Sequence, residues 1–184
     1  MDTPAYTPEQ LLAALRSGES DATHARELLA ASDDDNAARL RLDVAQRLAS
    51  AILPGDHALA QWLLKQETRA LKRAGSGSTE TLITLVAVVA RFADPHDAIL
   101  IWRAREATPE TRENIDVEQM ARAGIERVRA HLSAVARADT VDAHDAAAAL
   151  RWLDAGVAEG IDADLAGYFM WSDERFGLHV SGPT

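Results

Sequence analysis

Only one segment of this chain has the composition of a β-strand, and that fact constrains the fold more than any other. Residues 82–92 are rich in β-branched side chains, which are typical of strands. No second strand-like segment occurs, so a strand here would leave its backbone groups without partners. The segment is therefore predicted to be a helix that is apolar on all sides and lies at the centre of the molecule. We expect Val86 and Val89 in the deepest part of the core.

The rest of the chain is predicted to form short helices separated by clear stop signals. Thr7-Pro8-Glu9-Gln10 has the form of a helix-starting capping box, and Leu40, Val44 and Leu48 recur at helical spacing. A loop or a short helix is expected around 112–114. The nine predicted helices cover approximately residues 8–17, 21–31, 36–53, 57–74, 82–92, 95–106, 116–137, 140–160 (or 142–156) and 162–176.

Two architectures accommodate nine short helices with brief loops, an orthogonal bundle and an α-solenoid. An internal similarity favours the solenoid. Three helices carry Asp and His in the first turn and a tryptophan one or two turns later, and these tryptophans are Trp62, Trp102 and Trp152. Their spacings of 40 and 50 residues bracket the period of HEAT-like repeats, about 40–47 residues. We expect these three side chains in the core.

Short motifs in the second half of the chain resemble those of uncharacterised bacterial helical-repeat proteins. They lie at residues 102–105, 114–118, 123–126 and 131–132, and residues 150–171 continue the pattern. The resemblance covers less than half of the chain. It implies an all-α, HEAT-like array and brings no activity or cofactor with it. We expect one domain over residues 1–184, with a single candidate boundary at 75–78.

Composition excludes several kinds of site and partner. The chain has no cysteine, which excludes disulfides, thiolate zinc sites and iron–sulfur clusters. Its net charge of −10 argues against a dedicated nucleic-acid binder. The first residues lack a secretory signal, and no apolar run approaches the roughly 20 residues of a membrane span. We therefore expect a cytoplasmic protein without membrane contact or cofactor.

Charge is distributed unevenly along the sequence. Residues 1–35 carry a net charge of −6, residues 36–137 carry +3, and residues 138–174 carry −8. Two acidic ends therefore flank a basic middle. One interpretation is that these charges are ordinary solvated helix faces. The functional hypothesis is that the basic middle binds an acidic protein partner, and a second copy of this chain, forming a homo-oligomer, would supply such acidic segments.

The best candidate for a binding surface is a row of cations on the helix at 57–74. Its members are Lys65, Arg69, Lys72 and Arg73. They follow one another at steps of four, three and one, so they share one face of the helix, where neighbours or a ligand must neutralise them. The preceding helix has three arginines that would extend the row, namely Arg39, Arg41 and Arg47. Trp171 is a second candidate, because the last helix has few neighbours to bury it.

Histidine with aspartate is the only pattern that suggests catalysis, and the residues concerned are His57, His96, Asp97 and Asp145. The set resembles the metal ligands of HD phosphohydrolases, which are a His, a His-Asp doublet and a distant Asp. Residues 144–145 are the alternative His-Asp doublet. A divalent ion held in this way would activate water for attack on a phosphoester. However, the His96-Asp97 doublet lies at a helix start, where such residues cap free amides. We therefore predict a non-enzymatic protein-binding module without metal, with a metal-dependent phosphohydrolase as the alternative.

Overall fold

The computed structural model describes residues 6–17, 20–30, 35–74 and 77–179. Within these ranges the chain forms eleven α-helices and three 3-10 helices, without a β-strand. Their bounds are α1 Pro8–Ser17, α2 Ser20–Ala30, α3 Asp35–Ser50, η1 Pro54–Asp56, α4 His57–Ala74, α5 Thr79–Ala90, η2 Pro95–Asp97, α6 Ala98–Arg105, α7 Pro109–Asn114, α8 Val117–Ala121, α9 Ile125–Arg137, α10 Ala143–Glu159, η3 Ile161–Asp164 and α11 Leu165–Arg175. The predicted all-α class is confirmed for this part of the chain. None of the described helices has the length and apolarity of a membrane span.

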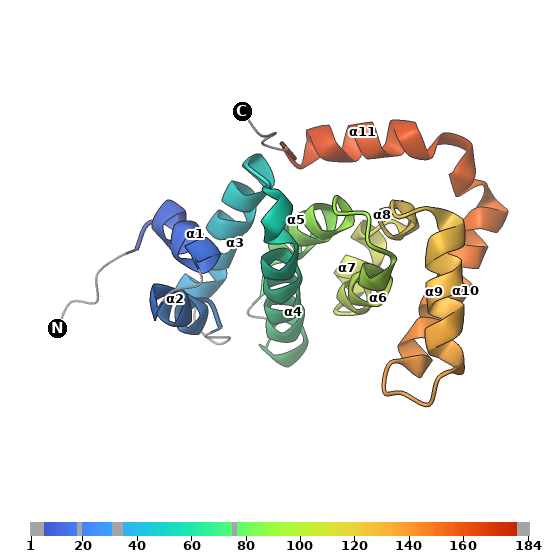
Figure 1. Ribbon diagram of the computed structural model, residues 1–184, viewed down its shortest axis with the longest axis horizontal. Coiled ribbons are helices and arrows are strands. Elements are labelled where there is room, and N and C mark those ends of the chain that lie inside the picture. Colours follow the sequence, from blue (N-terminus) through green and yellow to red (C-terminus); the bar gives the residue numbers. More distant parts are fainter. Residues whose placement is uncertain (1–5, 18–19, 31–34, 75–76, 180–184) are drawn as a thin grey trace.

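The helices follow one another along the long axis of the molecule (Figure 1). Helices α1, α2 and α3 pack together at one end, and the α9–α10 hairpin forms the other. Helix α11 then crosses back towards α3. There the backbone of His179 is held in place, because its N–H donates to the Ala49 carbonyl (3.0 Å) and its carbonyl accepts from Ile52 (2.9 Å). The tail after α11 is thus anchored on the end of α3.

Helix α5 lies at the centre of the core, as the sequence predicted. Ser78 begins the helix by accepting a hydrogen bond from the Thr81 backbone N–H. Every residue from Leu82 to Ala90 except Ile83 is buried, and the exposed fractions of Val86 and Val89 are 1% and 0%. Helices α3, α4, α6, α7 and α8 all pack against it. An element enclosed on so many sides must be apolar around its whole circumference.

One continuous hydrophobic cluster runs from Leu11 to Leu178. It contains residues on both sides of the candidate boundary at 75–78, of which residues 75 and 76 lie outside the described part. Trp62, Trp102 and Trp152 pack against this cluster without being fully buried. The last two tryptophans meet across α6 and α10, with ring centroids 5.7 Å apart.

The structure differs from the predicted helix at 116–137, which is two helices rather than one. Helix α8 ends at Ala121, and α9 begins at Ile125. Between them Gly124 has a φ of +94°, a conformation that a glycine adopts readily and a side chain opposes. The prediction was wrong here because the charge ladder of Glu118, Arg122 and Glu126 continues across the break. The regular spacing of charges carries no information about the backbone conformation of the glycine between them.

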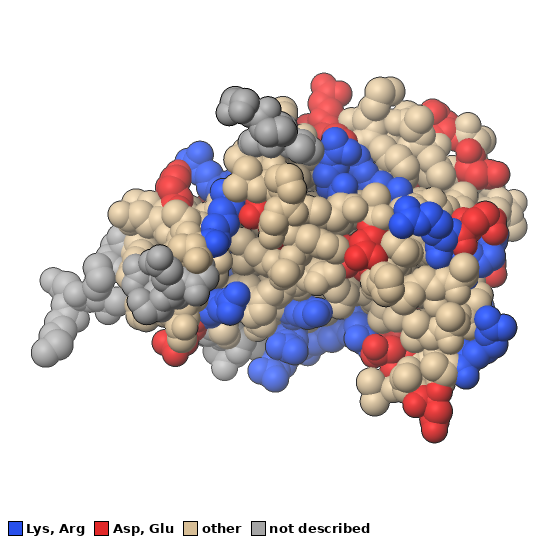
Figure 2. All heavy atoms as spheres, viewed as in Figure 1, with Lys and Arg blue, Asp and Glu red and all other residues tan. Residues whose placement is uncertain are grey.

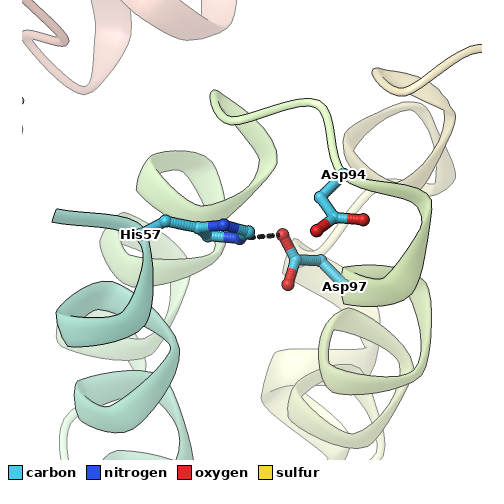
Figure 3. Close-up of side chains that lie close together, drawn as sticks. All are labelled: His57, Asp94 and Asp97. Atoms are coloured by element: carbon cyan, nitrogen blue, oxygen red, sulfur yellow. Dashed lines mark hydrogen bonds and ion pairs between the residues drawn. The ribbon is translucent and has the colours of Figure 1, made fainter. Parts of the chain in front are cut away.

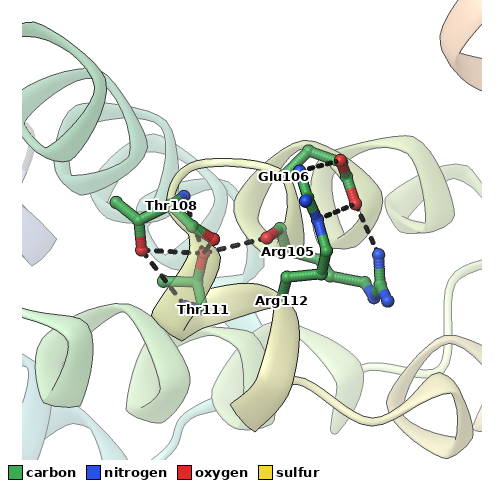
Figure 4. A network of polar contacts seen from close by, with 5 residues as sticks. All are labelled: Arg105, Glu106, Thr108, Thr111 and Arg112. Atoms are coloured by element: carbon green, nitrogen blue, oxygen red, sulfur yellow. Dashed lines mark hydrogen bonds and ion pairs between the residues drawn. The ribbon is translucent and has the colours of Figure 1, made fainter.

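The segment expected to be a loop or a short helix is helix α7 (Figure 4). Thr108 and Thr111 cap its start reciprocally, since each hydroxyl accepts from the other residue's backbone N–H (3.1 and 2.9 Å). The Thr111 hydroxyl also donates to the carbonyl of Arg105 at the end of α6 (2.8 Å). Arg112 pairs with Glu106 (2.8 Å). These bonds fix the turn between α6 and α7 and compensate for the shortness of α7.

Helix α11 is attached to α8 by a chain of polar contacts. The buried Gln119 amide donates to Ser172 Oγ (2.8 Å) and to the Tyr168 hydroxyl (3.2 Å). The Tyr168 hydroxyl in turn donates to Asp116 (2.9 Å). Burial raises the pKa of Tyr168 far above its ordinary value, and the negative charge of Asp116 raises this pKa further. The phenol therefore keeps its proton in the folded protein.

This arrangement predicts an unusual alkaline titration. The chain has only two tyrosines, so in the Tyr6→Phe variant all phenolate absorbance comes from Tyr168. We expect no phenolate near pH 10, the ordinary tyrosine pKa, until the protein unfolds. Because the pKa of Tyr168 is raised by folding, the protonated phenol stabilises the folded protein fully at pH values below the pKa of an unfolded tyrosine. This contribution to the free energy of unfolding is lost as the pH rises above that pKa. Ultraviolet absorbance and circular dichroism, followed together, check this; phenolate at pH 10 with unchanged helicity would contradict it.

Candidate functional site

Three of the four predicted cations line a groove between α4 and α6. The groove has a volume of about 360 Å³, and its lining consists of Leu64, Lys65, Thr68, Arg69, Lys72, Leu100 and Arg103. Figure 2 shows lysine and arginine side chains gathered over the C-terminal half of α4 and towards α6. Arg73 is exposed on the same helix but lies outside the lining. We call this site the cationic groove.

The amphipathic pattern of α4 places these residues. Leu63 and Leu71 are buried in the core, which turns the opposite face of the helix towards solvent. Lys65, Arg69 and Lys72 lie on that exposed face. Beside them Leu64, Thr68 and Leu100 give the groove an uncharged floor. Lys65 and Lys72 are also the only two lysines of the chain.

The groove concentrates positive charge without a compensating carboxylate in its lining. Within the described residues, Lys65, Arg69 and Lys72 make no ion pair. Arg103 is different, because its guanidinium contacts both Asp142 and Asp145 at 2.6 Å. Burial alone would lower the pKa of Arg103, but the hydrogen bonds to the two carboxylates outweigh it and raise this pKa. Arg103 is thus a fixed cation, and the other three are available to a ligand.

The predicted extension of this row onto the preceding helix is wrong for Arg41. Arg41 is only 1% exposed and forms an ion pair with the fully buried Glu67. Arg47 pairs with Glu9 at 2.7 Å. Arg39 and Arg47 are the exposed arginines of the three. Arginine spacing by itself cannot separate a solvated helix face from a buried ion pair.

Part of the charge asymmetry of the sequence is neutralised within one molecule. Acidic residues after position 138 pair with arginines of the basic middle. These pairs are Arg103 with Asp142 and Asp145 (2.6 Å each), Arg122 with Asp173 (2.7 Å) and Arg129 with Asp154 (2.9 Å). The cationic groove keeps three exposed cations that pair with none of the described carboxylates.

Trp171, the second candidate for binding, lies away from the groove lining. Its side chain is on α11 and is 46% exposed. The Arg175 guanidinium lies 5.0 Å from the centre of its ring, within cation–π range. The neighbouring Met170 is 72% exposed. The structure therefore places Trp171 on a separate surface that shares no residue with the cationic groove.

The structure brings together two of the four residues in the alternative metal set. His57 Nε2 lies 2.7 Å from Asp97 Oδ2. His96 instead bonds Asp94, and Asp145 pairs with Arg103. Among the described residues, the group close enough to hold one ion is His57, Asp94 and Asp97. Asp94 also caps η2, because its carboxylate accepts a hydrogen bond from the His96 backbone N–H (2.9 Å).

Sequence reasoning missed Arg103 as part of the groove. Its helix is separated from α4 by the whole of α5, so no local pattern connects it to Lys65 and Arg69. No family model, curated protein or solved structure matches the chain. The chemistry of the side chains that meet in the fold is therefore the basis for interpreting the site.

Proposed function

We propose that the protein is a non-enzymatic helical-repeat module that binds an acidic segment of a partner protein in the cationic groove. The observation that carries this proposal is the set of three exposed cations without ion-pair partners among the described residues, beside the fixed cation Arg103. Carboxylates of a partner would supply the missing counter-charges. Leu64 and Leu100 would contact apolar side chains between those carboxylates.

The order of helices around the groove supports a repeat array. Helix α4 packs on α6, and α6 packs on α10. Each of the three carries one tryptophan of the internal similarity, Trp62, Trp102 and Trp152. Consecutive packing of equivalent helices is the arrangement of an α-solenoid, whose extended faces bind other chains. The cationic groove would then lie between two neighbouring equivalent helices.

A protein partner fits these features better than a phosphoester substrate or a nucleic acid. A phosphohydrolase of the predicted kind needs Asp145 at its metal, and this carboxylate is engaged by Arg103. A nucleic acid would meet a chain of net charge −10 and would have to be held by one short cationic surface. An acidic peptide needs only a few carboxylates at the groove. A second copy of the chain, through residues 1–35 or 138–174, is one such partner.

The test uses a short labelled peptide in which glutamates alternate with leucines. We expect Lys65→Glu/Arg69→Glu to weaken its binding about tenfold or more, because like charges would then face each other. The matched control is Arg39→Glu/Arg151→Glu, which makes the same charge change at two exposed residues outside the groove. Fluorescence anisotropy at low and physiological salt measures both. Wild-type binding should weaken with salt, because exposed charges are screened within about 8 Å at physiological ionic strength.

The same variants examine self-association. A lower molar mass of Lys65→Glu/Arg69→Glu in light scattering, with the control unchanged, would identify a second copy as the partner. Acetylation provides an independent measurement, because the amines it can reach are Lys65, Lys72 and the chain start. Bound peptide should protect the two lysines. Equal affinity of both variants, or unprotected lysines in the peptide complex, would contradict the proposal.

A further inference from the structure

Three side chains with metal-binding atoms converge where α4 and α6 begin (Figure 3). His57 is the first residue of α4, Asp94 caps η2, and Asp97 ends η2 directly before α6. One nitrogen or oxygen from each residue lies within 4.8 Å of the others. His57 Nε2 and Asp97 Oδ2 are 2.7 Å apart. The site thus joins two helices through one nitrogen donor and two carboxylates.

Hydrogen bonds orient both carboxylates: they engage both oxygens of Asp97 and one oxygen of Asp94. Asp97 Oδ1 accepts from the Gln61 amide (2.7 Å). Asp94 Oδ1 accepts from the backbone N–H of His96 (2.9 Å) and lies 2.7 Å from Nδ1 of its ring. The second oxygen of Asp97 faces His57, and Asp94 Oδ2 has no hydrogen bond among the described residues. Outer partners that hold one oxygen and leave the other available are typical of metal-binding carboxylates.

The three side chains differ in how far they are buried, and the His57 ring is held in place. The Asp97 side chain is only 2% exposed, while those of His57 and Asp94 are 26% and 32% exposed. The His57 ring is stacked on Phe92, with centroids 4.7 Å apart, which limits its rotation. A divalent cation would neutralise both carboxylates at once.

We propose that His57, Asp94 and Asp97 bind one divalent transition-metal ion, of the class that accepts imidazole and carboxylate ligands together, with Zn²⁺ as its representative. Imidazole suits zinc and its neighbours, whereas Mg²⁺ prefers oxygen ligands and retains several waters. The ion links the start of α4 to the start of α6 and has a structural role. This inference is independent of the cationic groove and of the function proposed for it.

The experiment uses the untagged full chain after treatment with chelator. Calorimetric titration with Zn²⁺ should give one ion per chain, and titration with Mg²⁺ should give no comparable binding. An ion that binds only the folded state raises the melting temperature. At a hundredfold excess over its dissociation constant the expected rise for a chain of this size is about 5–10 °C.

Matched variants locate the ion. Asp94→Asn removes a carboxylate and keeps the helix cap, because asparagine caps as well as aspartate; His57→Gln removes the nitrogen donor. Both should weaken Zn²⁺ binding at least about tenfold, the lower end of the effect of losing even an outer partner. His144→Gln, at an exposed histidine of α10, should bind as the wild type does. Absence of stoichiometric Zn²⁺, or wild-type affinity in both Asp94→Asn and His57→Gln, would overturn the site.

Discussion

Replacing Glu67 by leucine should destabilise the protein by about 3–5 kcal/mol, because it removes one partner of a buried ion pair, the carboxylate that contacts the Arg41 guanidinium. Both side chains are almost completely buried, at 0% and 1% exposure. Glu67 also accepts a hydrogen bond from the Ser78 backbone N–H at the start of α5, and Arg41 donates to the Leu29 carbonyl at 2.9 Å. One carboxylate therefore connects α3, α4 and α5. Urea denaturation followed by circular dichroism measures the change.

Two further variants show whether the buried charge is the cause. The double replacement Arg41→Met/Glu67→Leu should recover most of the loss, since an apolar pair of similar volume can substitute for a buried ion pair. It should not recover the part of the lost stability that comes from the hydrogen bond between the Ser78 backbone N–H and Glu67. Removing the exposed pair instead, with Glu9→Ala, should cost far less, because water screens an exposed ion pair. A Glu67→Leu variant as stable as Glu9→Ala would refute this account.

Replacing Val89 by aspartate should prevent the protein from accumulating in soluble, folded form. Val89 is 0% exposed in the middle of α5, and the helices that enclose it leave a charge there without water. An unpaired buried charge costs several kcal/mol even after relaxation. The free energy of unfolding of a domain is about 5–15 kcal/mol, so the substitution would remove much of it. Soluble yield and the thermal melt are the measurements.

The chain offers a matched control for this change. Val141 is 93% exposed, and Val141→Asp makes the same substitution in solvent, where about ±0.5 kcal/mol is expected. Val89→Ala, which leaves a cavity without a charge, should fold with a loss of about 2 kcal/mol. A Val89→Asp variant that melts like Val141→Asp would place α5 at the surface.

Local signals predicted the helices well, because each helix start depends on residues close in sequence. The Thr7–Gln10 capping box forms as predicted, with bonds of 2.9 and 3.2 Å, and α4 has the predicted bounds. The uniformly apolar segment 82–92 predicted the central helix because its composition allows no exposed face. The break at Gly124 was missed, although a glycine inside a long helical pattern is a recognised warning.

The candidate sites were less predictable, because they depend on which helices meet. Arg41 was placed on a solvated face, yet it lies three residues before Val44 and four after Ala37, both of which are buried. Glu67 is likewise four residues after the buried Leu63. Arg41 on α3 and Glu67 on α4 are thus opposite charges that each lie among the buried apolar positions of their helix. This pattern was a signal for a buried ion pair. No comparable local signal connects Arg103 with Lys65, or Asp94 with His57.

The attachment of His179 to the end of α3 has a consequence for how the protein forms during synthesis. In an array of helices that contact only their neighbours, the first units can complete their structure before the last ones exist. Here the Ala49 carbonyl and the Ile52 N–H are both hydrogen-bonded to the backbone of His179. While the chain is still on the ribosome, the end of α3 must satisfy these groups with water. The end of α3 therefore acquires these two hydrogen bonds only after residue 179 has emerged.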